Sequence, residues 1–239
     1  IGYDHRLAKY DVVGSIAHAQ MLGKRGIIPK SDAQKIVAGL TKILGQIEAG
    51  KFKFNPKAED VHTNIQMVLK ALIGKSADKL HTARSRNDQI VLDVKLYCLD
   101  EMDQIIAAAA SLQKAIVVFA RTNQGVIIPA YTHLQSAQVV LLAHHMLAYV
   151  EMLERDKGRL RDCLKRLDTM PLGSCALSGT SLKIDRNYVA KLLGFAGVAQ
   201  NSMDAVSDRD FIVEAVSACA ILAMHLSRIS EDLILWATR

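Results

Sequence analysis

The feature that most constrains the fold of this chain is a series of apolar residues near its C-terminal end, spaced four or three residues apart. The series comprises Phe211, Ala215, Cys219, Leu222, Leu226, Ile229, Leu233 and Trp236. Such spacing lines up apolar side chains along one continuous face of an α-helix, as in a coiled-coil seam. A long helix with a continuous seam needs partners of similar length, so the pattern predicts a helical bundle.

Helical periodicity recurs along the rest of the chain and predicts an all-α fold. We expect short helices over residues 11–25, 31–50 and 60–73, and long helices over residues 88–122, 135–165 and 208–238. Ser31 and Asp60 are the predicted N-caps of two of the short helices. The 239 residues include only 4 Pro and 5% aromatic residues, which favours helices over a β-sandwich or barrel.

The short helices precede Lys79 and the long helices follow it. We therefore expect two domains. Residues 1–79 would form a small N-terminal helical domain that is incomplete at its start, and residues 80–239 a central helical-bundle domain that is incomplete at its end. Half of the residues are hydrophobic, which is ample for a core.

Composition and targeting signals argue against several classes of protein. No apolar run approaches the ~18 residues that a membrane span requires, and no signal-peptide pattern opens the sequence. Cys98, Cys163, Cys175 and Cys219 form neither a CxxC pair nor a disulfide-rich spacing, which indicates reduced thiols. We therefore expect a cytoplasmic protein.

The formal net charge of +6 allows two interpretations. A nucleic-acid-binding protein would gather its basic residues on one face, with aromatic residues for stacking. Here basic and acidic residues alternate, as in residues 151–162, which is typical of a solvated helix face. A positive field that attracts a small polyanionic substrate is the favoured interpretation.

A polar run, HTARSRNDQ, occupies residues 81–89 just before the first long helix. Its Ser, Asn and Asp residues favour helix N-termini, so we expect the helix to begin there. Unpaired backbone N–H groups and the positive end of the helix dipole would meet beside Arg84 and Arg86. A carboxylate or phosphate would bind at such an end, although composition alone equally allows a cap with two solvated arginines.

Two further segments carry distinctive motifs. Residues 128–138 read IPAYTHLQSAQ and residues 171–180 read PLGSCALSGT. Together with the run at 81–89, they resemble the HTGRSRNDQ, PGYTHLQxAQP and PLGSGAxAGT signatures of the argininosuccinate lyase family, which belongs to the fumarase/aspartase superfamily. Residues 201–205 and 208–211 also match in the expected order, so the resemblance covers the whole chain.

The sequence departs from the family pattern at several positions. Ala83, Ala130 and Cys175 stand where the family usually has Gly, and Val139 where it has Pro. Gln66 replaces a usual Glu. The Gly replacements matter most, because residues with a Cβ tolerate positive φ poorly.

The resemblance implies a reversible β-elimination of argininosuccinate to arginine and fumarate, a step of arginine biosynthesis and of the urea cycle. An enzyme for this reaction must stabilise the doubly charged aci-carboxylate that develops when a proton leaves the carbon beside a carboxylate. It also needs a base for that carbon and an acid for the departing nitrogen. The resemblance implies no cofactor and no metal ion.

The same resemblance assigns the site residues. His133 matches the histidine of proton transfer, and its role as acid or base stays open. The positions that match substrate-binding residues are Ser85, Arg86, Asn87, Thr132 and His62. The resemblance further implies a homotetramer with composite active sites and a small-molecule substrate, argininosuccinate, with no nucleic-acid or membrane partner.

Two alternatives remain open from the sequence. A sister enzyme such as adenylosuccinate lyase, aspartase or fumarase would share the fold and the elimination. The second alternative is a non-catalytic structural protein, since the family has also been recruited as a lens crystallin. The family's GSSxMPxKxN loop, with the serine most often proposed as base, is expected beyond Arg239. We therefore expect the recorded chain to be truncated relative to the family and inactive by itself.

Overall fold

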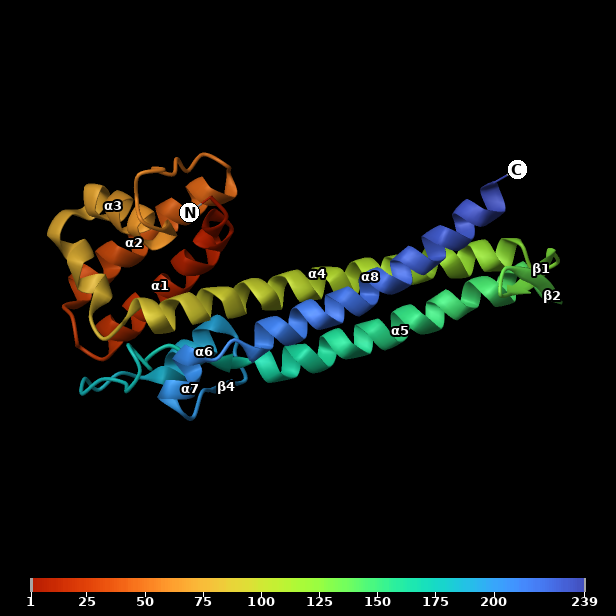
Figure 1. The fold of residues 1–239 in the computed structure, drawn as a ribbon. Helices are drawn as coiled ribbons and strands as arrows, with labels where there is room; N and C mark the ends of the chain where they lie inside the picture. The colour runs from red at the N-terminus through yellow and green to blue at the C-terminus, as the bar shows by residue number, and fades with distance from the viewer. Residues whose placement is uncertain (1, 239) are drawn as a thin grey trace. The chain divides into compact units, whose positions relative to one another are not determined.

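The computed structural model describes residues 2–238 and is predominantly helical, which confirms the predicted all-α class (Figure 1). Its α-helices are α1 (Ala8–Lys24), α2 (Lys30–Glu48), α3 (Val61–Ile73), α4 (Arg86–Thr122), α5 (Leu142–Leu167), α6 (Arg186–Leu193), α7 (Ser202–Ser207) and α8 (Asp210–Ala237). The 3-10 helices are η1 (Asp4–Leu7) and η2 (Gly74–His81). The strands are β1 (Ile127–Thr132), β2 (Gln135–Leu141), β3 (Thr169–Met170) and β4 (Gly197–Val198).

The two predicted N-caps have different outcomes. The Asp60 side chain caps α3 as predicted, because its Oδ1 accepts a hydrogen bond from the Thr63 N–H at 2.6 Å. The predicted cap at Ser31 is wrong. The helix α2 begins at Lys30, directly after the extended Pro29, and its N-cap makes no side-chain hydrogen bond. The Pro29 carbonyl accepts hydrogen bonds from the Asp32 and Ala33 N–H groups, each at 3.0 Å, so the helix begins ahead of the serine.

The chain packs into two compact units. One consists of residues 1–99 and 167–208, and the other of residues 100–166 and 209–239. The expected domain boundary at Lys79 falls inside the first unit, within η2. The predicted division at Lys79 therefore does not coincide with the boundary between the two compact units. Whether residues 1–79 and 80–239 fold independently remains a prediction.

The core of the first unit lies among α1, α2 and α3 (Figure 1). Its most deeply buried large side chains are Met21, Leu22, Ile36, Leu40, Ile43, Ile65, Leu69, Leu80, Leu92 and Met170. The helices α1 and α2 approach closely because Gly23 has no side chain. A Cβ there would lie 2.5 Å from the Cβ of Ala33.

The strands β3 and β4 position the loop at residues 171–180 within the same unit. They pair in parallel, with Thr169 opposite Gly197. Lys95 of α4 supports β3 by donating from Nζ to the Thr169 carbonyl at 3.0 Å. After β3, the Arg186 Nε donates to the Leu172 carbonyl at 3.1 Å. The loop is therefore tied to α4 on one side and to α6 on the other.

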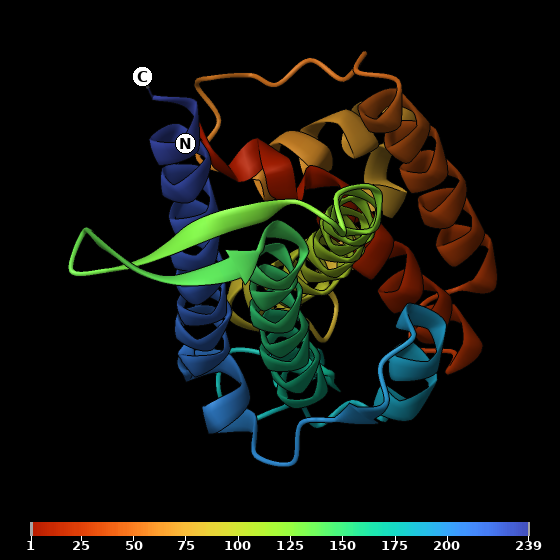
Figure 2. The ribbon, with the colours of Figure 1, turned by 90° about the vertical axis from the view of Figure 1, so that its right-hand side faces the viewer.

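A β-hairpin occupies part of the expected long helix at 135–165, so that helix prediction is wrong at its start. The strands β1 and β2 are antiparallel, with Thr132 opposite Gln135, and α5 begins only at Leu142 (Figure 2). The two turn residues, His133 and Leu134, have φ of 52° and 60°. Two positive φ values are typical of the tight turns that connect hairpin strands, but the usual Asn-Gly sequence is missing.

The core of the second unit lies between α5, α8 and the C-terminal half of α4. Its buried members are Ile116, Ala120, Met146, Tyr149 and Leu153, with Leu222 and Ile229 of α8 packed against them. Part of the predicted seam is therefore buried. The rest is not, since Leu226, Leu233 and Trp236 are exposed, together with apolar residues on other faces of α8 such as Val213 and Val216.

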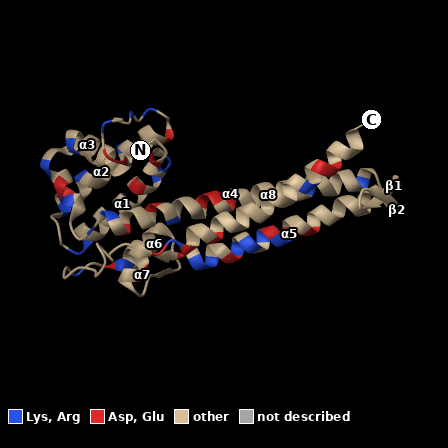
Figure 3. Cartoon of the chain, in the orientation of Figure 1, with Lys and Arg blue, Asp and Glu red and all other residues tan. Residues whose placement is uncertain are grey.

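Two helices are apolar over a greater length than the sequence analysis anticipated. Windows of 18 residues in α4 and α8 reach mean hydropathies of 1.4 and 1.6, with 22% and 17% of each window buried. By length and composition alone each could cross a membrane, and α8 carries few charged residues (Figure 3). Helices that pack on more than one face in a bundle have the same composition.

Candidate active site

The run at residues 81–89 begins a helix as predicted, since α4 starts at Arg86. Ser85 and Asp88 form a reciprocal cap. The Ser85 Oγ accepts a hydrogen bond from the Asn87 N–H at 3.2 Å, and the Asp88 Oδ1 accepts one from the Ser85 N–H at 3.0 Å. This arrangement is a capping box with aspartate in the place of the usual glutamate.

The Arg86 side chain is anchored to the start of α3. Its Nε donates to the Asp60 Oδ2 at 3.0 Å, and its Nη2 donates to the Thr63 Oγ1 at 3.0 Å. Burial alone would raise the pKa of Asp60, but hydrogen bonds from Thr63 and the Arg86 charge hold that pKa below its ordinary value. About a third of the Arg86 side chain, 35%, remains exposed and can contact a ligand.

The helix start is also joined to the loop at residues 171–180. The exposed Asn87 donates from Nδ2 to the Ala176 carbonyl at 2.8 Å. The Asp88 Oδ2 accepts hydrogen bonds from the Gly173 N–H at 2.9 Å and the Cys175 N–H at 2.7 Å. Two of the three motifs in the sequence therefore meet at one place in the first unit.

Two of the departures from the family pattern fall at strained backbone positions. Ala83 has φ of 55° and Cys175 has φ of 54°, in the left-handed region that favours glycine. The two residues are in contact, since the Cys175 Sγ lies 3.4 Å from the Ala83 carbonyl oxygen. Ala130 does not have positive φ, so the loss of glycine there has no such cost.

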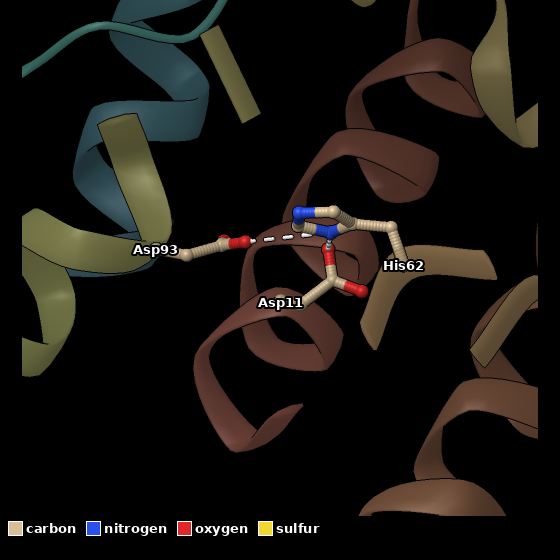
Figure 4. A group of neighbouring side chains, drawn as sticks. All are labelled: Asp11, His62 and Asp93. Carbon is tan, nitrogen blue, oxygen red and sulfur yellow. Dashed lines mark ion pairs between the residues drawn. The ribbon is translucent and has the colours of Figure 1, made fainter. Parts of the chain in front are cut away.

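A buried ionisable cluster lies in the first unit, formed by Asp11 of α1, His62 of α3 and Asp93 of α4 (Figure 4). The His62 Nδ1 is 3.1 Å from the Asp11 Oδ1 and 3.6 Å from the Asp93 Oδ2. All three side chains are almost completely buried. His62, a sequence-predicted binding residue, therefore lies in the core rather than on an open surface.

The pKa values of the two carboxyl groups in this cluster are shifted in opposite directions. Burial would raise the pKa of Asp11, but His62 and Arg84 stabilise the ionised form and hold that pKa below its ordinary value. Burial and the charge of Asp11 raise the pKa of Asp93 well above its ordinary value. Neither oxygen of Asp93 has a hydrogen-bond partner among residues 2–238. The two carboxyl groups thus differ in how strongly their surroundings favour the ionised form.

The three possible ligand atoms lie within 4.8 Å of one another, a spacing that a divalent cation could bridge. The positive charge of Arg84 already acts on both carboxyl groups. Arg84 itself is fixed by donating from Nη1 to the Ser15 Oγ at 2.8 Å. A cation would have to share the cluster with this guanidinium, so the cluster fits a charge-compensated core better than a metal centre.

The remaining sequence-predicted residues lie in the second unit. Thr132 ends β1, and His133 forms the exposed hairpin turn. A cavity of about 570 Å³ is lined by Tyr131 and His133 from the hairpin and by His145, Asp232 and Trp236 from the helices. The His145 Nε2 is 2.6 Å from the Asp232 Oδ2.

The structure therefore sorts the predicted site residues into two groups. Ser85, Arg86 and Asn87 lie together at the start of α4, with His62 in the core of the same unit. Thr132 and His133 belong to the hairpin of the other unit.

Three features of the site were not predicted from the sequence: the link made by Asp88, the cluster residues Asp11 and Asp93, and the His145–Asp232 pair. For Asp11 and Asp93 a signal was present, since each is a carboxylate within an otherwise apolar helical pattern.

Comparison with known proteins places the chain in a family of enzymes. Residues 1–239 match the model of the lyase family, and the chain belongs to that family. Among curated relatives, the argininosuccinate lyase of Geobacter sulfurreducens is 55% identical over 238 residues, covering 100% of this chain and 52% of the relative. The argininosuccinate lyase of Pelotomaculum thermopropionicum is 53% identical with the same coverage. The resemblance to argininosuccinate lyases is thus confirmed.

Solved structures agree with this assignment. EDDS lyase, in complex with formate and as a variant with bound fumarate, superposes with a TM-score of 0.85 at 28% identity. The match covers 98% of this chain and 46% of that protein. The chain thus spans about half the length of the relatives it matches.

Proposed function

We propose that the protein to which this chain belongs is an argininosuccinate lyase, which cleaves argininosuccinate reversibly to arginine and fumarate in arginine biosynthesis. The observation that carries the proposal is the start of α4, where Asp60 holds Arg86 and the loop at 171–180 holds Asn87. The identity of 53% and 55% to curated argininosuccinate lyases over the whole chain supports the substrate.

The start of α4 would bind a carboxylate of the succinyl group. Backbone N–H groups at a helix N-terminus and the positive end of its dipole stabilise an anion, and the Arg86 guanidinium adds a full charge. The same groups would stabilise the aci-carboxylate that forms as the C–H bond breaks. Since Asp60 and Thr63 anchor Arg86, little reorganisation is needed when that charge develops.

In this mechanism Thr132 and His133 act on the succinyl part from the hairpin. A base removes the proton, the C–N bond breaks, and an acid protonates the departing guanidinium nitrogen, leaving the double bond of fumarate. A histidine changes protonation near neutral pH and can serve either role. The exposure of His133 at a turn leaves its imidazole accessible to substrate.

We further propose a homotetramer with composite active sites, in the cytoplasm. The apolar residues left exposed on α4 and α8 support the assembly, since contiguous apolar surfaces of this kind are usually covered by partners. Helices of other subunits would cover these residues. Such packing would explain why α4 and α8 are apolar enough to resemble membrane-spanning helices.

The test is to express the gene's full-length product and measure fumarate release by its ultraviolet absorbance. Argininosuccinate should be the substrate that gives product, and adenylosuccinate, aspartate and malate should give none. Release from adenylosuccinate instead would indicate a sister enzyme. A folded protein that releases no fumarate from any of the four would indicate a structural, crystallin-like role.

A further inference from the structure

We propose that Asp88 is a positioning residue for the elimination: its carboxylate fixes the start of α4, and with it Arg86 and Asn87, against the backbone of residues 173–175. The inference rests on the proposed function and assigns a role to a residue that does not itself contact the substrate.

Asp88 serves two segments that lie 85 or more residues apart in sequence. One oxygen accepts from the Ser85 N–H at 3.0 Å, at the start of α4. The other accepts from the Gly173 N–H at 2.9 Å and the Cys175 N–H at 2.7 Å. The side chain is 0% exposed, so water cannot replace these bonds.

The backbone at residues 173–175 has the form of an anion-binding nest. Gly173 has φ of 95° and Cys175 has φ of 54°, and their N–H groups converge on one carboxylate oxygen. Such nests favour a negative charge. Glycine suits position 173, because a side chain would be strained at its φ of 95°.

The consequence for the site follows from the order of residues in α4. Arg86 and Asn87 immediately precede Asp88, so any shift of Asp88 moves both side chains. Asn87 is bound to the same loop through the Ala176 carbonyl at 2.8 Å. With Asp88 in place, the loop and the helix start form one rigid recognition surface.

A simple helix cap would satisfy only the contact with Ser85. Loss of a simple cap lowers stability and has no reason to alter substrate recognition. Because Asp88 also binds Gly173 and Cys175, we expect its replacement to weaken substrate binding by more than the loss of stability alone would explain.

The experiment compares Asp88→Asn with Asp185→Ala in the full-length enzyme. Asp185 is a suitable control because it caps α6 in the same unit, by accepting from the Tyr188 N–H at 2.9 Å, and its side chain makes no hydrogen bond to either motif within residues 2–238. We expect Asp88→Asn to raise KM for argininosuccinate about tenfold or more and to lower kcat about threefold or more, since Arg86 and Asn87 would hold both the bound carboxylate and the charge that develops on it. Asp185→Ala should lower the melting temperature and leave KM unchanged.

A second variant and a second readout complete the test. Asp88→Glu keeps the charge but adds a methylene in a site without free space, and we expect it to fold and to raise KM about threefold or more. Fumarate binding, followed by calorimetry, should weaken in parallel with KM. The proposal would be overturned if Asp88→Asn kept the KM and the fumarate affinity of the wild type. If only Asp88→Glu folds, the same result in that variant would overturn it. Failure of the wild-type enzyme to release fumarate would instead overturn the proposed function.

Discussion

Ala83 and Cys175 adopt φ near +55°, in the left-handed region that favours glycine. A side chain in this region costs about 1 kcal/mol relative to glycine. We expect Ala83→Gly and Cys175→Gly each to raise the free energy of unfolding by about 0.5–1 kcal/mol, measured by urea denaturation. Ala130→Gly is the matched control. Because Ala130 lacks positive φ, the same replacement there should not stabilise the protein, and a gain of equal size would contradict the explanation.

His133 is the residue on which the proposed chemistry depends most directly. Replacing it with Asn should lower kcat by roughly two to four decades, the usual range for general acid–base groups. Substrate binding should weaken less, because Arg86 and Asn87 still hold the substrate. His5→Asn, a replacement of an exposed histidine in η1, should leave kcat unchanged. Near-normal turnover of His133→Asn would show that this histidine is structural.

His18 gives the first unit a predictable response to acid. It is buried in α1, and its Nε2 donates to the Thr82 carbonyl at 2.8 Å. Burial and the charge of Arg84 lower the pKa of His18 to about 3, so the folded protein keeps it neutral. The unfolded chain binds a proton there below pH ~6.5, so His18 stabilises the fold above pH ~6.5 and that contribution is lost as pH falls toward 3.

The measurement is the free energy of unfolding at pH 7 and at pH 5. We expect wild type to lose stability over this interval and His18→Gln to lose less, since glutamine can still donate to Thr82 but does not titrate. His5→Gln, at an exposed site, should follow the wild-type curve. Equal pH dependence of wild type and His18→Gln would show that His18 does not control the response.

At the scale of elements, the helices were largely predictable and the hairpin was not. Apolar side chains at steps of three and four show which face of a helix is buried, and this signal located α3, α4 and α8 closely. The turn at His133 and Leu134 carries neither Gly nor Asn, so local sequence gives no sign that the chain reverses there. The strands are determined by pairing with each other rather than by their own pattern.

The candidate site was predictable to a similar extent. The motif at residues 81–89 indicated a helix start, because capping residues act within four positions of one another. The bonds from Asp88 to Gly173 and Cys175 join distant parts of the chain. Such contacts depend on tertiary packing, and neither spacing nor composition reveals them.

The hairpin turn offers a test at this scale. Leu134 has φ of 60° and is 81% exposed, so its backbone is strained while its side chain contributes little to a core. We expect Leu134→Gly to stabilise the hairpin by about 1 kcal/mol. Hydrogen exchange of the paired Ile128 and Val140 should slow accordingly. Faster exchange in the variant would show that the leucine side chain itself holds the turn.

For the whole molecule, the decisive feature is apolar surface that the chain leaves uncovered. Val213 and Val216 on α8 are 67% and 62% exposed. If partner subunits cover them, the double replacement Val213→Lys and Val216→Lys should dissociate the full-length assembly, because buried unpaired charges are costly. Sedimentation velocity should then show smaller species. Ser230→Lys, at an exposed polar position of the same helix, is the control, and an unchanged assembly in the double variant would exclude α8 from the interface.

The contact between Asp88 and the loop at 173–175 also limits what can be transferred between proteins. A designer who copied only residues 81–89 into another scaffold would import a charged residue whose two backbone donors stay behind. The nest would need to be copied as well, with its glycine and its left-handed turn. Under the proposed function, recognition of the substrate would therefore depend on both segments, and a change in one of them would require a matching change in the other.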